Sequence, residues 1–285
     1  MHVADWGQIT GDLLVFGGAY SNLAALHAVL ALRGQSRVIN TGDLVAYCAQ
    51  AAETVACARR ADLLSIAGNV ERQLGDNALD CGCGFADGSA CDLLSAAWYG
   101  FANLAIGSEE RAWMSGLPDA AVFHWNGRRV AVIHGGVTDP VRFLWPSTEA
   151  AVFEEELAAL LQVAGPIDVV LSGHSGVAFH RRIKDVDWIN AGVIGMPPND
   201  GRVDTRYARV TQQGVIFERL VYDVTLTVDA MKAAGLTQGY HKALQTGYWP
   251  SEDVLPPALR RVPLVPSFSP KARAGELEEG HPQRA

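Results

Sequence analysis

Short apolar runs that end at glycine alternate with stretches of helical periodicity in the amino-terminal part of the chain. Leu13–Phe16 is apolar throughout and stops at Gly17, which indicates a buried strand followed by a tight turn. A helix is predicted next, because leucines recur at helical spacing within residues 23–30 and either Ser21 or Asn22 can cap it. The sequence therefore begins with a strand, a turn and a helix.

The same unit then recurs twice. Val38-Ile39 runs into Thr41-Gly42-Asp43, a helix is predicted over residues 51–60, and the apolar run 63–67 leads into Gly68-Asn69. Alternating strands and helices favour a parallel sheet covered by helices. In such a sheet the loops at the carboxyl ends of the strands are available for chemistry.

The rest of the chain predicts a mixture of parallel and antiparallel pairing. Asn126-Gly127 lies between two apolar runs and is a strong two-residue hairpin signal. The other predicted elements are a helix at residues 89–105, a buried strand at 167–171 and several antiparallel strands between 177 and 221. We therefore expect an α/β fold with a pair of mixed sheets and outer helices.

We expect one catalytic domain over residues 1–225. Residues 226–285 are expected to form C-terminal helices and a poorly ordered tail, since the sequence from Pro250 onward is rich in proline and charge.

Composition limits the classes of function. The chain has 285 residues, of which 49% are hydrophobic and 19% charged, and this excludes disorder, a collagen-like repeat and a coiled coil. With 23 basic and 31 acidic side chains the net charge is −8, which argues against binding to a nucleic-acid backbone. A small or metal-bridged anionic substrate stays possible, because a bound dication can invert the local field.

Location and cysteine chemistry are inferred in the same way. No apolar run is long enough to cross a membrane and the amino terminus has no secretory pattern, so a cytoplasmic protein is expected. Five cysteines form an odd set, which disfavours a disulfide framework and favours buried thiols or metal chemistry. The sequence does not indicate the oligomeric state.

Four polar residues each follow an apolar strand directly: Asp43, Asn69, His134 and His174. Each alone is also compatible with ordinary turn chemistry or a structural histidine. Together, a carboxylate, an amide oxygen and two imidazoles suit a divalent ion of the Mn, Fe, Zn or Ni class. Parallel strands would bring these residues to one edge of the sheet, so we predict a metal site there with one or two ions per chain.

In this order the motifs resemble those of the calcineurin-like metallophosphoesterase superfamily, over about residues 13–247. The matching segments are Gly42-Asp43, Gly68-Asn69-Val70-Glu71, His134-Gly135, Gly173-His174 and the run Trp188–Pro197. The resemblance implies a four-layer αββα sandwich of two mixed sheets flanked by helices. It also implies hydrolysis of phosphomonoesters or phosphodiesters by a two-metal site.

The sequence departs from this family at the ligands of one metal. The family's first strand ends in Asp-x-His, whereas this chain has Gly18-Ala19-Tyr20, and Gly176 stands where the closing Gly-His-x-His motif has its second histidine. The ligands implied for the other metal are all present. Val70 also replaces a histidine that many relatives use to protonate the leaving group.

The altered metal site has three possible explanations. The first is that the site is vacant and a single ion acts alone. The second is that substrate or water fills it, and the third is that cysteines provide new ligands. Cys48 follows the Asp43 loop, and Cys81 and Cys83 follow the Asn69 loop, so these thiols are possible extra ligands. Buried cysteines without a metal are also common.

Two further side chains are candidates for catalysis. Tyr20 can donate a hydrogen bond to the substrate or the leaving oxygen, and Arg142 can hold a phosphate in a bidentate way, although packing and a surface ion pair explain them as well. The leading hypothesis is metal-dependent hydrolysis of a small phosphate mono- or diester. The alternative is a non-catalytic nucleotide- or anion-binding or sensing protein on a degenerate phosphoesterase scaffold, because fold alone does not fix function.

Overall fold

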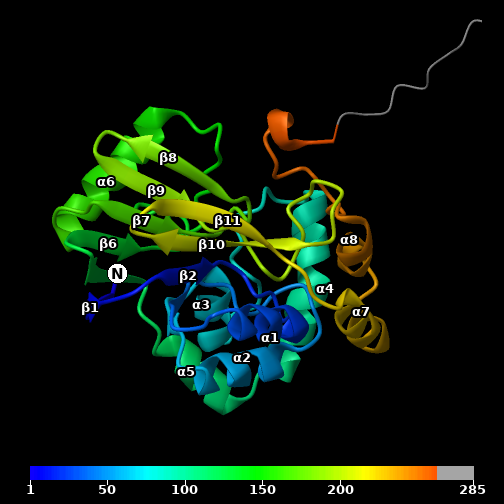
Figure 1. Cartoon of the computed structure of the whole chain (residues 1–285). Helices are drawn as coiled ribbons and strands as arrows, with labels where there is room; N and C mark the ends of the chain where they lie inside the picture. Colours follow the sequence, from blue (N-terminus) through cyan, green and yellow to red (C-terminus); the bar gives the residue numbers. More distant parts are fainter. Residues whose placement is uncertain (262–285) are drawn as a thin grey trace, which may run out of the picture.

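Two mixed β-sheets pack face to face in the computed structural model, which describes residues 1–261 (Figure 1). The first is a six-stranded sheet in the order β1-β5-β6-β7-β9-β8. Its strands are β1 (Val3–Ile9), β5 (Ala120–Trp125), β6 (Arg128–Val132), β7 (Val169–Ser172), β8 (Phe179–Ile183) and β9 (Val186–Asn190). Strand β6 is parallel to β7, and β7 is parallel to β9, so these three carboxyl ends lie at one edge.

The second sheet has five strands in the order β11-β10-β2-β3-β4. These are β2 (Leu13–Phe16), β3 (Arg37–Asn40), β4 (Leu64–Ser65), β10 (Thr205–Thr211) and β11 (Gly214–Leu220). The three amino-terminal strands are parallel to each other, and β10 pairs antiparallel with β2. The alternation of strand and helix seen in the sequence therefore produced the parallel half of this sheet, as predicted.

Helices cover the outer face of each sheet. The helices of the described chain are α1 (Leu23–Ala31), α2 (Ala51–Arg60), α3 (Asn69–Gly75), α4 (Ala90–Ala105), α5 (Ser108–Ser115), α6 (Ala150–Ala164), α7 (Val224–Ala233), α8 (Tyr240–Thr246) and the short 3-10 helix η1 (Pro257–Leu259). Leu26 of α1 packs with Phe16 on the five-stranded sheet, and Phe153 of α6 packs with Trp188 on the six-stranded one. The expected four-layer αββα sandwich is confirmed.

The interior between the sheets is filled by alternate side chains of both. Val15 and Ile39 from one sheet meet Val132 and Leu171 from the other, and all four are almost fully buried. Burial of apolar area is the dominant stabilising contribution, at about 25 cal/mol per Å² removed from water. This core holds the strand ends of both sheets in fixed positions.

Several local predictions are confirmed and others fell short. Asn126 and Gly127 have φ of 49° and 76° and join β5 to β6 as the predicted hairpin. Asn22, rather than Ser21, caps α1, with its side chain accepting from the Ala25 amide at 3.1 Å. The sequence analysis did not predict β1, α5 or α6.

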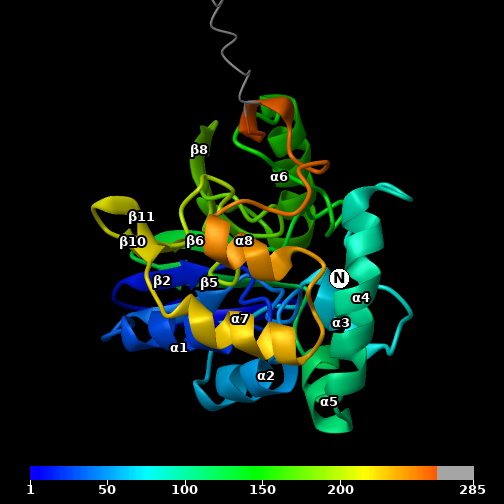
Figure 2. The same ribbon diagram turned by 90° about the vertical axis from the view of Figure 1, so that its right-hand side faces the viewer.

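The C-terminal helices pack against the rest of the chain. Helix α7 contacts both α1 and α8, and Figure 2 shows α7 and α8 beside each other. Met231 and Leu244 from these helices lie in the same apolar cluster as Val45 and Val70. The prediction of a poorly ordered tail from Pro250 onward falls mainly on residues 262–285, which lie outside the described residues. Within residues 1–261, no helix combines the length and apolar character that a membrane crossing requires.

Candidate metal centre

The four predicted ligands lie together where the two sheets meet. Asp43 follows β3, Asn69 opens α3 just after β4, His134 follows β6, and His174 follows β7. Each sheet thus contributes two of them from the carboxyl ends of its strands. One ligand atom each from Asp43, His134 and His174 lie within 4.8 Å of one another, and all four side chains are buried.

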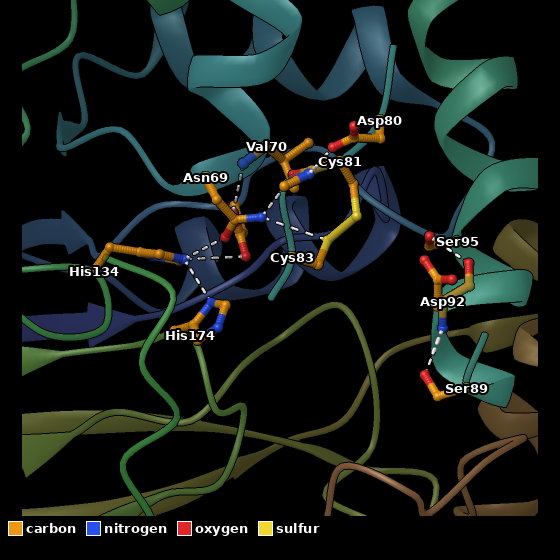
Figure 3. The surroundings of a disulfide bond; sticks show 12 residues. Asn69, Val70, Asp80, Cys81, Cys83, Ser89, Asp92, Ser95, His134 and His174 are labelled. Atoms are coloured by element: carbon orange, nitrogen blue, oxygen red, sulfur yellow. Dashed lines mark hydrogen bonds and ion pairs between the residues drawn. A yellow bond between two sulfur atoms is a disulfide. The ribbon is translucent and has the colours of Figure 1, made fainter. Parts of the chain in front are cut away.

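Nε2 of His134 is the centre of this arrangement (Figure 3). Asn69 Oδ1 lies 3.0 Å from it, His174 Nδ1 3.1 Å and Asp43 Oδ2 3.3 Å. Nδ1 of His134 donates to the Thr41 carbonyl at 2.7 Å, which leaves Nε2 of the neutral ring without a proton. This nitrogen then faces the oxygens of Asp43 and Asn69 and a ring nitrogen of His174 in a buried space, an arrangement that a bound cation would satisfy.

The donor set fits a divalent transition metal. Imidazole nitrogen, carboxylate oxygen and amide oxygen match the preferences of Mn, Fe, Zn and Ni. One ligand atom from each of Asp43, His134 and His174 lies close enough to the others for all three to contact the same ion. These residues could therefore hold one ion.

Burial and neighbouring charges shift the pKa values of three of the predicted ligands. Burial opposes ionisation of Asp43, but the adjacent His134 outweighs it and lowers the pKa of the carboxyl below its usual value. Burial and the neighbouring His134 lower the pKa of His174 to about 3, so this ring is neutral. Burial disfavours the charge on His134, yet Asp43 raises the pKa of its ring. A metal ion bound to the His134 ring would replace the proton that Asp43 favours on this ring.

Glu71 organises the loops that carry the ligands, a role that the sequence analysis did not give it. Its carboxylate accepts from the amides of Asp43 at 2.7 Å, Gly68 at 2.8 Å and Val45 at 3.3 Å. Burial and the nearby Asp43 raise its pKa to about 7. The signal that could have found it is Gly68-x-x-Glu71 at a helix start, which has the spacing of a capping box.

Asn40 is a second buried residue whose role the sequence did not reveal. Its Nδ2 donates to the Gly17 carbonyl at 2.9 Å, while its Oδ1 accepts from Ser65 Oγ at 2.7 Å and the Gly42 amide at 3.1 Å. It therefore ties together the ends of three parallel strands next to the ligands.

The cysteines considered as extra ligands are differently placed. Cys81 and Cys83 form a disulfide, a pairing that the odd number of cysteines did not indicate. Asn69 Nδ2 donates to the Cys81 carbonyl at 2.9 Å and to Cys83 Sγ at 3.4 Å, and this turns the amide oxygen of Asn69 toward His134 (Figure 3). Cys48 is a buried free thiol whose pKa burial raises, so it stays protonated. As a disulfide, Cys81 and Cys83 offer no thiolate.

Tyr20 occupies the space of the missing Asp-x-His ligands. A β-carbon at Gly18 would overlap the Tyr20 ring, so the phenol lies over the position from which an aspartate would extend. Tyr20 also lines the same cavity as Asp43 and His174. Tyr47, which the sequence analysis did not single out, lines this cavity beside it, with ring centroids 4.7 Å apart.

Arg142 lies outside this cavity. Its Nη1 contacts Glu155 at 2.9 Å and Glu156 at 2.8 Å, and Glu156 is fully buried. The same Glu156 accepts from the amides of Val137 and Thr138. The guanidinium therefore fixes a loop, and its predicted contact with phosphate gains no support from the geometry.

Comparisons with known proteins agree with the geometry. The sequence profile of the calcineurin-like phosphoesterase superfamily domain matches residues 14–213. A metallophosphoesterase from Sphaerobacter thermophilus is 21% identical, with a TM-score of 0.65, 84% of this chain covered and 100% of that one. A hypothetical protein from Pyrococcus horikoshii is 16% identical, with a TM-score of 0.70 and coverage of 85% and 99%. No curated protein matches the sequence.

Proposed function

The chain belongs to the calcineurin-like phosphoesterase superfamily, and from this membership we propose that it hydrolyses a small phosphate mono- or diester with a divalent metal ion. The observation that carries the proposal is the convergence of Asp43, Asn69 and His174 on Nε2 of His134 within 3.3 Å. An ion bound there supplies a Lewis acid for a phosphoryl oxygen and lowers the pKa of a water molecule.

A single ion is the stoichiometry that we propose. The Tyr20 ring lies over Gly18, where the family has an aspartate ligand. At Gly176 a β-carbon would lie 3.7 Å from the Trp249 ring, so an aromatic side chain also stands near the position of the missing histidine. An aromatic ring thus covers the position of one missing ligand and another lies next to the position of a second.

Tyr20 is the proposed hydrogen-bond donor to the substrate. Burial and the negative charge of Asp43 raise its pKa well above its usual value, so the phenol keeps its proton at neutral pH. From the wall of the cavity that also contains Asp43 and His174, it would donate to a phosphoryl oxygen or to the leaving oxygen. This role compensates in part for Val70, which is buried and has no proton to give.

The charge of the cavity favours a diester over a monoester. No lysine or arginine is among the described residues that line it. One divalent ion beside the carboxylate of Asp43 leaves about one unit of positive charge, which balances the single negative charge of a phosphodiester. The second charge of a monoester would have no partner.

The alternative is binding without hydrolysis, and Val70 is the observation in its favour. Both functions predict that a phosphate ester binds beside the ion, and they differ in whether it is cleaved.

Chelation followed by return of single metals separates the two. We expect Mn²⁺, Fe²⁺, Zn²⁺ or Ni²⁺ to restore hydrolysis of bis(p-nitrophenyl) phosphate, with slower turnover of p-nitrophenyl phosphate. The His174→Ala variant is the control for contaminating phosphatases. Recovery of unchanged ester with every metal would support the binding protein instead.

A further inference from the structure

A cavity opens beside Asp43 and His174, and six of the residues that line it are aromatic. Its aromatic residues are Tyr20, Tyr47, Phe85, Phe143, Tyr240 and Trp249. Apart from the phenol of Tyr20, the proposed metal chemistry uses none of these rings, although they line the same cavity as Asp43 and His174.

Three phenol rings form one part of the wall. Tyr47 is at the centre, with its ring 4.7 Å from Tyr20 and 4.3 Å from Tyr240, and Trp98 packs behind it at 5.0 Å. Tyr20 and Tyr47 have φ of 54° and 43°, a left-handed backbone that bulky residues rarely adopt. Backbone of this kind costs stability and is concentrated at functional sites, so these two rings are held in the wall at an energetic cost.

Phenylalanine rings form a second part, adjacent to the metal ligands. The ring of Phe143 lies 4.3 Å from that of His174 and is stacked with Phe85 at 6.2 Å. Trp145 stacks on Phe143 at 5.5 Å with nearly parallel planes. The aromatic surface therefore continues up to a proposed ligand of the ion.

The segment after α8 provides a further part, and its position is fixed by polar contacts. Trp249 donates from Nε1 to the Pro197 carbonyl at 2.6 Å and from its amide to Asn199 Oδ1 at 2.8 Å. Asn199 Nδ2 in turn donates to Glu252 at 2.7 Å. Both Tyr240 and Trp249 follow residue 213, where the match to the superfamily ends. This chain thus adds two aromatic residues from outside the matched domain to the wall of its site.

We propose that this cavity binds a flat aromatic ester group of the substrate, with Tyr240 and Trp249 as specificity-determining residues. The placement of the phosphate beside Asp43 and His174 rests on the proposed function, whereas the preference for an aromatic group rests on the wall itself. Offset and edge-to-face contacts with rings favour a flat π-system over a saturated group of equal size. An aryl ring and a nucleobase share this chemistry.

Calorimetry with matched phosphonate monoesters measures the preference without any turnover. The probes are phenyl methylphosphonate and cyclohexyl methylphosphonate, which have the same charge and nearly the same size, together with thymidine 5′-methylphosphonate as the nucleobase probe. We expect the full chain, with and without Mn²⁺, to bind the phenyl ester about fivefold or more tightly than the cyclohexyl ester, as one added aromatic contact would give. The thymidine ester then assigns the source: tighter binding than the phenyl ester indicates a nucleobase, and weaker binding an aryl ring.

Variants locate the preference in the wall. Trp249→Leu and Tyr240→Leu should reduce the phenyl-to-cyclohexyl ratio to less than about twofold, while Trp249→Phe should keep most of it. Trp6→Leu makes the same change in strand β1, outside this cavity, and should leave the ratio as it is. A ratio between two ligands separates recognition from loss of fold, because partial unfolding weakens both equally.

Two results would overturn the inference. One is equal affinity of the full chain for the phenyl and cyclohexyl esters; the other is an unchanged ratio in both leucine variants. Either could occur in a protein that hydrolyses bis(p-nitrophenyl) phosphate, in which case the proposed function would stand without the aromatic preference. Conversely, the chain could hydrolyse no ester but still bind the phenyl ester more tightly than the cyclohexyl ester. In that case the aromatic preference would stand and the proposed hydrolysis would not.

Discussion

At the scale of single residues, the site depends on positions where no side chain fits. Gly42 has φ of 97°, and a β-carbon there would lie 2.7 Å from Nδ1 of His134. A β-carbon at Gly68 would overlap Oδ1 of Asp43. The glycines of Gly42-Asp43 and Gly68-Asn69 therefore let two loops approach closely enough for their polar neighbours to share one ion.

Tyr20 shows why the lost metal ligands are not restored by one substitution. Neither Gly17 nor Gly18 has a positive φ, so the backbone itself admits an aspartate at residue 18. The obstacle is the Tyr20 ring, which a side chain at residue 18 would overlap. Gly176, by contrast, has φ of 75° and would be strained by any side chain. Restoring these ligands would therefore meet an obstacle in side-chain packing at Gly18 and in the backbone at Gly176.

The first prediction concerns the ligands themselves. His134→Ala and His174→Ala should each weaken binding of Mn²⁺ or Zn²⁺ by about 100-fold or more, because every donor converges on the same point. Metal analysis after gel filtration and calorimetry measure the change. His27→Ala removes an exposed histidine of α1 and should keep the full metal content. If both ligand variants kept the full metal content, the motifs would be structural turns and the proposed metal site would be wrong.

At the scale of elements, the β8–β9 hairpin carries a cluster of ion pairs around Asp187. Arg128 lies 2.5 Å from its carboxylate, Arg182 2.9 Å and His180 3.0 Å. Burial acts against the charge, but these three hydrogen bonds outweigh it and lower the pKa of Asp187 to about 2. Strand β9 lies between β7 and β8, so the cluster holds an edge of the six-stranded sheet.

The second prediction follows from the sign of this shift. A carboxyl whose pKa is lower in the folded state stabilises the fold above the pKa of the unfolded chain and loses this effect as the pH falls through the folded pKa. Asp187→Asn should therefore cost about 1 kcal/mol at pH 7, discounted because the partners are partly exposed. Urea unfolding should show the difference shrinking between about pH 4 and pH 2, as linkage requires.

The neighbouring Asp185 provides the control for this prediction. It is exposed in the same hairpin and forms no ion pair within the described residues. Asp185→Asn should leave stability unchanged at both ends of the pH range. A constant difference between Asp187→Asn and the original chain from pH 7 to pH 2 would contradict the electrostatic explanation.

Predictability from the sequence followed the strength of local signals. Helix α2 was predicted with its observed bounds, and α4 to within one residue, because turn residues or a serine cap precede clear periodicity. Strand β1 has exposed and half-buried positions without strict alternation, so its pairing with β5 could not be recognised from its own residues. The pairing of a strand depends on its partner strand, and a local sequence pattern carries no information about that partner.

The site was predictable for a related reason, and only in part. The four predicted ligands lie two to four residues after the end of a strand, so topology alone could gather Asp43, Asn69, His134 and His174. Tyr47 and Trp249 reach the cavity through a left-handed backbone and through a segment after α8, and neither has a sequence signal. Asn40 was missed because two of its hydrogen bonds, to Gly17 and Ser65, join strands far apart in sequence.

At the scale of the whole molecule, the metal centre joins the two sheets. Asp43 and Asn69 come from loops of the five-stranded sheet, whereas His134 and His174 follow strands of the six-stranded one. A direct backbone contact supports this junction, from the Gly17 amide to the Gly192 carbonyl at 2.8 Å. An ion held by both sides would therefore stabilise the packing of one sheet on the other, and with it the fold as a whole.

The last prediction tests this consequence. An ion that binds only the folded chain, supplied at 100 times its dissociation constant, should stabilise the protein by about 2.7 kcal/mol. In a chain of this size the midpoint of thermal unfolding should rise by about 5 °C in scanning calorimetry, and a chelator should reverse the rise. His174→Ala should abolish most of the shift, because one side of the junction loses a donor. Metal that binds at this site but leaves the midpoint unchanged would contradict its role as a link between the sheets.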